Sequence, residues 1–146
     1  MILMRSIQIL FMYIWLDCEM KKMSLLELLD RIVRNSEKVP YITPDKYNLL
    51  NMRRMEKKIN GTLKKIDFIS TIYFGKAKCL HRAIVEYIFL RKKYHFPVKI
   101  IIGVKKFPFE AHAWIAWIDD DFPDGFEEKE NIVGYQVIFD STMLMS

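Results

Sequence analysis

The sequence predicts an α+β fold in which a helical N-terminal half packs on a small antiparallel sheet. Apolar residues recur at helical spacing through residues 1–74, whereas short runs rich in β-branched and aromatic residues follow residue 97. At 146 residues, with no internal repeat or linker, the chain is expected to form one domain, 1–146. Within it, residues 1–74 form the helical part and residues 75–146 add one long helix and the sheet.

The first element is an apolar segment from Ile2 to Leu16, which Arg5 and Gln8 interrupt and Asp17 closes. A membrane span needs about 20 apolar residues. A signal peptide would also need a small-residue cleavage site, and none follows here. We therefore expect this segment to be buried or to face a partner protein, with weak membrane association as the alternative.

A second helix is predicted from Met23 to Asn35, because its leucines, isoleucine and valine recur at helical spacing. Ser24 is expected to cap its N-terminus. Glu27 follows three residues later, which completes the capping-box pattern.

Further helices are predicted on both sides of the pair Asn60–Gly61. The first opens at Pro44 and Asp45, and Asn60–Gly61 is expected to end it or at least to kink it. The second is expected from Leu63 to Tyr73.

The second half combines one helix with three strands. The helix is predicted from Cys79 to Tyr94, and the strands from Val98 to Val104, Phe109 to Ile118 and Ile132 to Phe139. An acidic polar loop, residues 119–131, precedes the third strand. We expect the three strands to form an antiparallel meander.

Composition limits the partners and cofactors. The net charge is +5, but no zinc-finger spacing or aromatic RNA-binding motif is present, so no nucleic-acid partner is expected. The two cysteines, Cys18 and Cys79, form no CxxC pair or disulfide framework. This pattern indicates a reducing cytoplasm and neither a metal nor a cofactor. Nine Met and 14% aromatic residues favour an apolar docking surface, formed by Ile2–Leu16 or around Trp117.

Cys79 and His112 are the candidate nucleophile and base. Cys79 opens a predicted helix, where free backbone N–H groups and the helix dipole favour a thiolate. His112 lies near the start of a predicted strand between Ala111 and Ala113, and such small neighbours leave an imidazole accessible. An activated cysteine needs a base of this kind, and the backbone N–H of Cys79 is the expected oxyanion donor.

Three segments together resemble the leader peptidase of lasso peptide biosynthesis, the transglutaminase-like cysteine peptidase half of the lasso "B" protein. They read Lys78-Cys79-Leu80-His81-Arg82-Ala83-Ile84, then Ile101-Ile102-Gly103-Val104, then Pro108-Phe109-Glu110-Ala111-His112-Ala113-Trp114. The resemblance is close over residues 78–114 and loose over the helical half. It implies a transglutaminase-like or papain-like core with Cys79 as nucleophile and His112 as base.

The resemblance also implies a substrate and partners. The expected reaction removes the leader from a ribosomally made precursor peptide and frees the core N-terminus for macrolactam formation by a partner lasso cyclase. A separate small leader-recognition protein is the second expected partner. A transglutaminase-like amidase or acyltransferase acting on another substrate, or an inactive scaffold in a peptide-maturation complex, are the alternatives.

The acid that would complete the triad stays open in the sequence. If Ile132–Phe139 pairs with the strand that carries His112, Asp140 returns opposite the histidine, which makes Asp140 the first choice. Asp124 fits the shorter spacing usual in the family, although Pro123-Asp124-Gly125 has the composition of a turn. The remaining alternatives are Asp119, Asp120 and Asp121.

Overall fold

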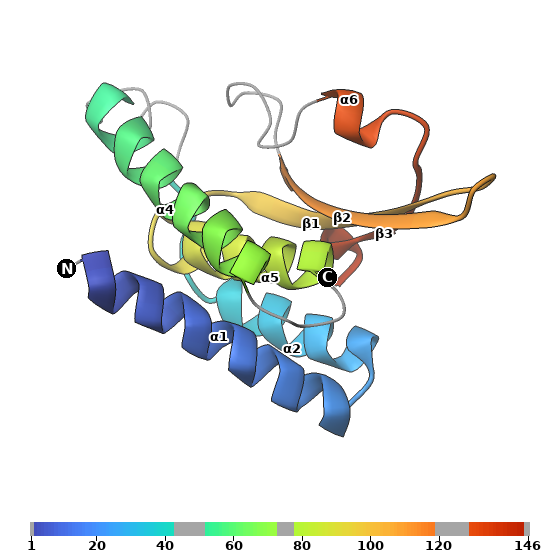
Figure 1. The fold of residues 1–146 in the computed structure, drawn as a ribbon, viewed down its shortest axis with the longest axis horizontal. Coiled ribbons are helices and arrows are strands. Elements are labelled where there is room, and N and C mark those ends of the chain that lie inside the picture. Colours follow the sequence, from blue (N-terminus) through green and yellow to red (C-terminus); the bar gives the residue numbers. More distant parts are fainter. Residues whose placement is uncertain (1, 43–51, 73–77, 119–128, 145–146) are drawn as a thin grey trace.

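A computed structural model describes residues 2–42, 52–72, 78–118 and 129–144. Four helices form a layer on one side of a three-stranded antiparallel sheet, and a short helix lies on the other side (Figure 1). The helical layer contains α1 (Ile2–Lys22), α2 (Leu25–Ser36), α4 (Met52–Ile72) and α5 (Lys78–Lys92). The predicted α+β class, with helices packed on a small antiparallel sheet, is therefore confirmed.

Helix α1 contains the N-terminal apolar segment and buries only one of its sides. Ile9, Tyr13 and Leu16 are at most 1% exposed and belong to the main core. The opposite side leaves large apolar side chains open to solvent: Met4, Ile7, Phe11, Ile14 and Trp15. None of the described helices, α1 included, combines the length and hydropathy needed to cross a membrane.

Helix α2 begins as its sequence predicts. The Ser24 hydroxyl accepts a hydrogen bond from the Glu27 backbone N–H, and the Glu27 carboxylate accepts one from the Ser24 N–H. This reciprocal capping box satisfies two of the donors that a helix start leaves open. The buried side of α2, including Leu28, Leu29 and Val33, joins the core that contains α1.

Helix α4 corrects the expected break at Asn60–Gly61. The helix runs without interruption from Met52 to Ile72. Ile59, Ile66 and Ile69 are buried in the core on both sides of the glycine, and this packing outweighs the low helix propensity of one Gly. The predicted start at Pro44 and Asp45 lies outside the described residues.

Helix α5 is the centre of the helical layer. Its residues Ala83, Ile84, Val85 and Tyr87 are at most 1% exposed and join the core that includes Ile100 and Ile115 of the sheet. Its bounds match the predicted helix within two residues.

The sheet order corrects the predicted meander. Strands β1 (Val98–Lys105), β2 (Glu110–Trp117) and β3 (Gln136–Asp140) are arranged β2-β1-β3, and both outer strands pair antiparallel with β1. β3 therefore pairs with β1, not with β2 as expected. Ile100, Ile101 and Ile102 form a continuous apolar run, which suits a central strand that is covered on both faces.

This order also accounts for the long segment between β2 and β3. Both strands run antiparallel to β1, so they run parallel to each other and their connection must return along the whole sheet. Such a crossover needs a dozen or more residues. This connection contains the short helix α6 (Lys129–Ile132). The third strand was predicted to begin at Ile132, but Ile132 ends α6 and β3 begins only at Gln136.

Arg91 joins the end of α5 to the chain that follows α2. Its side chain is 0% exposed and donates hydrogen bonds to the carbonyl oxygens of Ser36, Val39 and Phe96. Its guanidinium also lies 3.4 Å from the Glu37 carboxylate and 4.3 Å from the ring centroid of Tyr41. Arg91 is thus a buried cation that joins three segments of the chain.

Candidate active site

Cys79 lies in the first turn of α5, as predicted. It is the second residue of that helix and is partly exposed. The first backbone N–H groups of a helix have no partner within the helix and carry the positive end of its dipole. The position is thus suited to a thiolate and to an oxyanion that forms beside it.

The hairpin-like return of the chain brings Cys79 and His112 to the same end of the fold. Helix α5 and strand β1 run in opposite directions (Figure 1). From Cys79 to Lys92 the helix rises about 20 Å, and from Val98 to Gly103 the strand rises about 17 Å. Because Gly103 pairs with His112, the helix start and the histidine lie at similar heights along the sheet.

His112 points to the face of the sheet away from the main core. Successive side chains of a strand point to opposite faces of the sheet, and Ala113 and Ile115 belong to the core that includes α5. His112 and Trp114 lie on the other face, where their rings stack with centroids 5.7 Å apart. The structure thus brings the backbones of the pair to one end of the sheet, while the catalytic dyad itself stays a prediction.

Tyr135, which directly precedes β3, completes an aromatic cluster around the histidine. Its ring centroid lies 5.6 Å from that of His112 and 6.2 Å from that of Trp114. The Tyr135 hydroxyl donates to a Glu110 carboxylate oxygen at 3.0 Å, and the Lys105 ammonium lies 4.8 Å from the ring centroid. The three rings thus contact one another, with His112 and Trp114 supplied by β2 and Tyr135 by the residue before β3.

The surroundings of Tyr135 raise the pKa of its phenol. Desolvation raises the pKa of the Tyr135 phenol, and the accepting Glu110 carboxylate and the Cys79 thiol raise it further. A neighbouring negative charge acts in this direction because it disfavours the phenolate.

Gly103 makes the aromatic cluster sterically feasible. A Cβ at this position would lie 2.9 Å from Cη2 of Trp114 and 3.0 Å from Cβ of Tyr135. Gly103 pairs with His112, so the missing side chain is the one that would project next to the imidazole. The Ile-Gly-Val segment noted in the sequence thus has a steric reason for its glycine.

We expect Gly103→Ala to lower turnover by about 10- to 100-fold, because a small displacement of a catalytic group has costs of this size. Trp114 and Tyr135 would have to move apart, and His112 would move with them. Gly61→Ala is the matched control, since no atom lies within 4 Å of the added Cβ in the middle of α4. It should keep turnover and add about 0.5–1 kcal/mol of stability. Steady-state kinetics and thermal unfolding of both variants measure these effects, and unchanged turnover in Gly103→Ala would contradict the role of the cluster.

Asp140 occupies a different part of the sheet from His112. Asp140 on β3 pairs with Ile101 along one edge of β1, whereas His112 on β2 pairs with Gly103 along the other edge. Its carboxylate binds the Lys99 ammonium at 2.9 Å and the Thr142 hydroxyl and N–H at 2.7 and 3.0 Å. The strand pairing that favoured Asp140 is therefore wrong, and its role as the orienting acid stays a prediction.

The charge state of Asp140 follows from these contacts. Burial raises the pKa of its carboxyl, but the bonds from Lys99 and Thr142 outweigh burial and leave the pKa below its usual value. The carboxylate is accordingly ionised at neutral pH, and its contribution to stability is lost only as the pH falls through that lowered pKa. The alternative acids Asp119, Asp120, Asp121 and Asp124 lie outside the described residues.

Other site features were missed or misjudged in the sequence. Trp117 is partly buried: it contacts Phe96 with ring centroids 5.1 Å apart and packs on the core, while a docking surface around it stays a prediction. His81 is 2% exposed and binds Asp17 of α1 at 2.7 Å, while its ring stacks on Tyr13. Tyr135 carried no signal in the sequence, since its contacts depend on the order of the strands.

The described residues contain no group of three or more His, Cys, Asp or Glu side chains arranged to hold a metal ion. The candidate site combines a thiol at a helix N-terminus with an imidazole on the adjacent sheet. This combination defines the class of α+β proteins whose core is a cysteine-bearing helix packed on an antiparallel sheet.

The comparisons with known proteins place the chain within that class. Residues 31–140 match the transglutaminase-like superfamily, and the match spans α5, all three strands, and both Cys79 and His112. The chain belongs to the transglutaminase-like superfamily. The search of curated proteins and the search of solved structures each returned no match.

Proposed function

We propose that the protein is a cysteine endopeptidase that removes the leader from a ribosomally synthesised lasso precursor peptide. The main support is the position of Cys79 in the first turn of α5, at the end of the sheet that carries His112. Membership of the transglutaminase-like superfamily fits such chemistry. The three segments that resemble lasso leader peptidases surround these same two residues.

In the proposed reaction, the Cys79 sulfur attacks the scissile carbonyl after His112 accepts the thiol proton. The backbone N–H of Cys79 donates to the oxyanion that forms. His112 then returns the proton to the leaving amine, which departs as the N-terminus of the core peptide. Water, activated by the same imidazole, hydrolyses the thioester and releases the leader with a free carboxylate.

The proposed partners are a separate leader-recognition protein and a lasso cyclase that uses the new N-terminus. The exposed apolar side of α1, with Met4, Phe11 and Ile14, is the proposed docking surface for one of them. Exposed apolar surface of this kind is typical of protein interfaces. The cytoplasm, where both cysteines would stay reduced, is the proposed compartment.

A transglutaminase-like amidase or acyltransferase is the second candidate, because a thioester on Cys79 could equally be captured by an amine. In that case acyl groups would move to a primary amine without cleavage of the peptide chain. An inactive scaffold is the third candidate, and it would leave the Cys79 thiol without any role in turnover.

The experiment that separates these candidates is mass spectrometry of a lasso precursor incubated with the chain and the leader-recognition protein. Leader peptidase activity gives two fragments whose masses sum to the precursor plus one water. Transfer activity instead gives an intact chain with altered mass when a primary amine is added. Unchanged precursor in both reactions would contradict the leader-peptidase proposal and would leave the candidate that acts on another substrate.

The identity of the acid is tested by Asp140→Asn. An orienting acid positions the imidazole without contacting the substrate, so its loss should lower kcat by about 10⁴-fold at most and leave KM almost unchanged. If Asp140 acts only through its ion pair with Lys99, Asp140→Asn and Lys99→Gln should lower the melting temperature by similar amounts and leave kcat unchanged. Kinetics and thermal unfolding of the two variants decide between these roles.

A further inference from the structure

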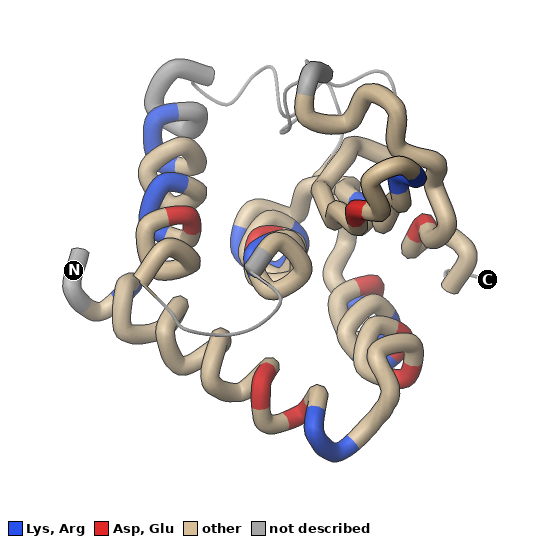
Figure 2. Tube along the Cα trace, turned by 45° about the vertical axis from the view of Figure 1, so that its right-hand side comes forward, with Lys and Arg blue, Asp and Glu red and all other residues tan. Residues whose placement is uncertain are grey.

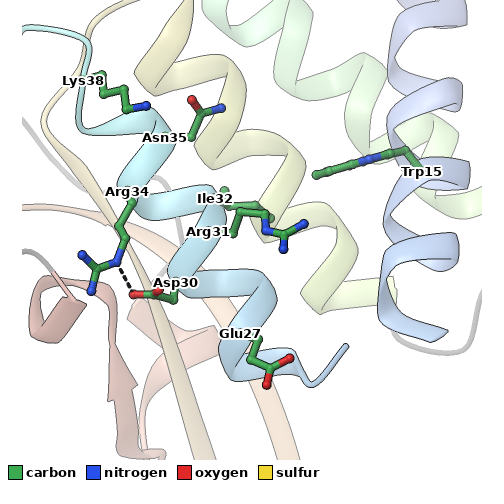
Figure 3. A pocket seen from close by; sticks show the side chains of 8 residues that line it. All are labelled: Trp15, Glu27, Asp30, Arg31, Ile32, Arg34, Asn35 and Lys38. Atoms are coloured by element: carbon green, nitrogen blue, oxygen red, sulfur yellow. Dashed lines mark hydrogen bonds and ion pairs between the residues drawn. The ribbon is translucent and has the colours of Figure 1, made fainter. Parts of the chain in front are cut away.

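Two hollows lie on the side of the helical layer that faces away from the sheet, and because both adjoin α1 we treat them together as one groove. Its wider part, a hollow of about 710 Å³, lies between α1 and α2 and is lined by Trp15, Arg31, Ile32 and Asn35 among others. Figure 3 shows the Trp15 indole pointing from α1 toward α2, with α5 passing behind. A second hollow of about 210 Å³ adjoins α5 and is lined by Met12, Ile88, Phe89, Lys92 and Lys93.

The two hollows open along the same flank of α1. Met12 and Trp15 are three residues apart, and residues at this spacing are neighbours on a helix surface. Arg91 binds the carbonyl oxygens of Ser36 and Val39, so the ends of α5 and α2 that carry Lys92 and Lys38 are held together. The groove therefore extends from these lysines toward Trp15 and the beginning of α2.

The groove has an apolar floor and a cationic end. Met12, Ile88 and Phe89 are only partly buried against the core, and Trp15 is 42% exposed. Both charged residues that line the second hollow are lysines. The first hollow has mixed charge: Glu27 caps α2, Asp30 pairs with Arg34 at 2.8 Å, and Arg31 lies 3.9 Å from Glu19. The cationic end of the groove is therefore the end with Lys92 and Lys93.

Further cations converge on the same end. Desolvation lowers the pKa of Lys93, and the charges of Arg5, Lys58 and Lys65 lower it further. These residues come from α1 and α4, and Arg5 is anchored by a hydrogen bond to the buried Thr62 hydroxyl at 3.0 Å. Figure 2 shows Lys and Arg repeated along α4. Clustered like charges repel one another, so a bound anion would relieve this repulsion.

We infer that this groove binds an acidic, apolar segment of the peptide substrate at a distance from the bond that Cys79 attacks. The inference rests on the proposed function for the identity of that peptide. An apolar floor beside clustered cations matches a segment in which carboxylates alternate with apolar side chains. The shape favours a peptide over a lipid surface, since the cations line a concave site and Arg5 turns away from the exposed apolar side of α1.

The position of the groove limits where the acidic segment lies in the substrate. Lys92 and Cys79 are at opposite ends of α5, about 20 Å apart along its axis. An extended chain needs about six residues to cover this length. The carboxylates are therefore expected at least about six residues from the scissile bond. The α1 wall of the groove also precedes residues 31–140, so the site depends on a helix outside the matched superfamily region.

The test uses a fluorescein-labelled synthetic peptide in which Glu residues alternate with Leu and Ser, together with a counterpart that carries Gln in place of Glu. Fluorescence anisotropy measures binding to the full chain. We expect the Glu peptide to bind, the Gln peptide to bind at least about tenfold more weakly, and affinity to fall as salt is added. Lys92→Gln/Lys93→Gln should weaken binding of the Glu peptide by about tenfold.

The matched control is Lys21→Gln/Lys22→Gln, because this pair also occupies the last turn of a helix but lies outside both hollows. It should bind the Glu peptide as the unmodified chain does. Trp15→Ala tests the apolar part of the groove and should also weaken binding. Thermal unfolding of each variant shows that the fold is retained.

Three outcomes would overturn the inference. The first is equal affinity for the Glu and Gln peptides. The second is an equal loss of affinity for the Glu peptide in Lys92→Gln/Lys93→Gln and in Lys21→Gln/Lys22→Gln. The third is binding to vesicles of phosphatidylglycerol and phosphatidylcholine without binding to the Glu peptide. Anisotropy measures binding without turnover. A negative binding result would therefore contradict the groove inference and leave the proposed peptidase activity untouched. With an active enzyme, Lys92→Gln/Lys93→Gln should raise KM for the precursor and leave kcat unchanged.

Discussion

Replacing Cys79 with Ala should reduce precursor cleavage to the uncatalysed background, a loss of about 10⁴-fold or more. The sulfur forms the covalent intermediate in the proposed reaction, and alanine offers no nucleophile in its place. The fold should survive, because Cys79 is partly exposed at the start of α5 and its side chain is not part of the core. Mass spectrometry of the precursor after single-turnover incubation measures the loss.

The chain supplies its own control for this result. Cys18 is an exposed free thiol on α1, and Cys18→Ala should leave cleavage unchanged. Alkylation with iodoacetamide should likewise inactivate the unmodified chain and Cys18→Ala at equal rates. Cleavage at the normal rate by Cys79→Ala, or inactivation that requires Cys18, would exclude Cys79 as the nucleophile.

Replacing Arg91 with Met should lower the free energy of unfolding by about 3–5 kcal/mol, the largest effect on stability that we expect. Methionine fills much of the same volume but cannot donate hydrogen bonds. The Val39 carbonyl oxygen would lose the bond from Arg91, and the nearby Glu37 carboxylate would lose its cation. The carbonyl oxygens of Ser36 and Phe96 would each lose one donor and keep another, the backbone N–H of Val39 and of Val98. A buried acceptor left without a donor destabilises the folded state.

Chemical denaturation monitored by circular dichroism measures this effect. Lys92→Met is the matched control, since Lys92 follows Arg91 directly on α5 but is exposed. Its free energy of unfolding should stay within about 0.5 kcal/mol of that of the unmodified chain. Equal stabilities of the two variants would show that the Arg91 contacts add no net stability.

The sequence was most informative where a local rule decides the structure. The capping box at Ser24 and Glu27 and the start of the helix at Cys79 depend on residues a few positions apart, and both predictions are confirmed. The predicted break at Asn60–Gly61 was wrong because core packing on both sides of Gly61 decides whether that helix continues. Propensity is a weak guide when buried isoleucines flank the glycine.

Pairing of the strands could not be read from spacing alone. The strand with Ile100, Ile101 and Ile102 needed to be recognised as central, although chain order places it first. That one choice decides whether Asp140 faces His112 and which side chains surround the imidazole. Residue type and local context single out Cys79 and His112 as candidates, whereas Tyr135 and the steric role of Gly103 depend on contacts across strands.

The strand order β2-β1-β3 distinguishes a connection whose length affects the strand register from one whose length does not. The pairing partners of β1 are fixed by register, so an insertion in the β1–β2 hairpin would shift His112 relative to Gly103. The crossover between β2 and β3 is free of this restriction, since it only has to reach from one outer strand to the other. Its length can therefore change without disturbing the register of the sheet.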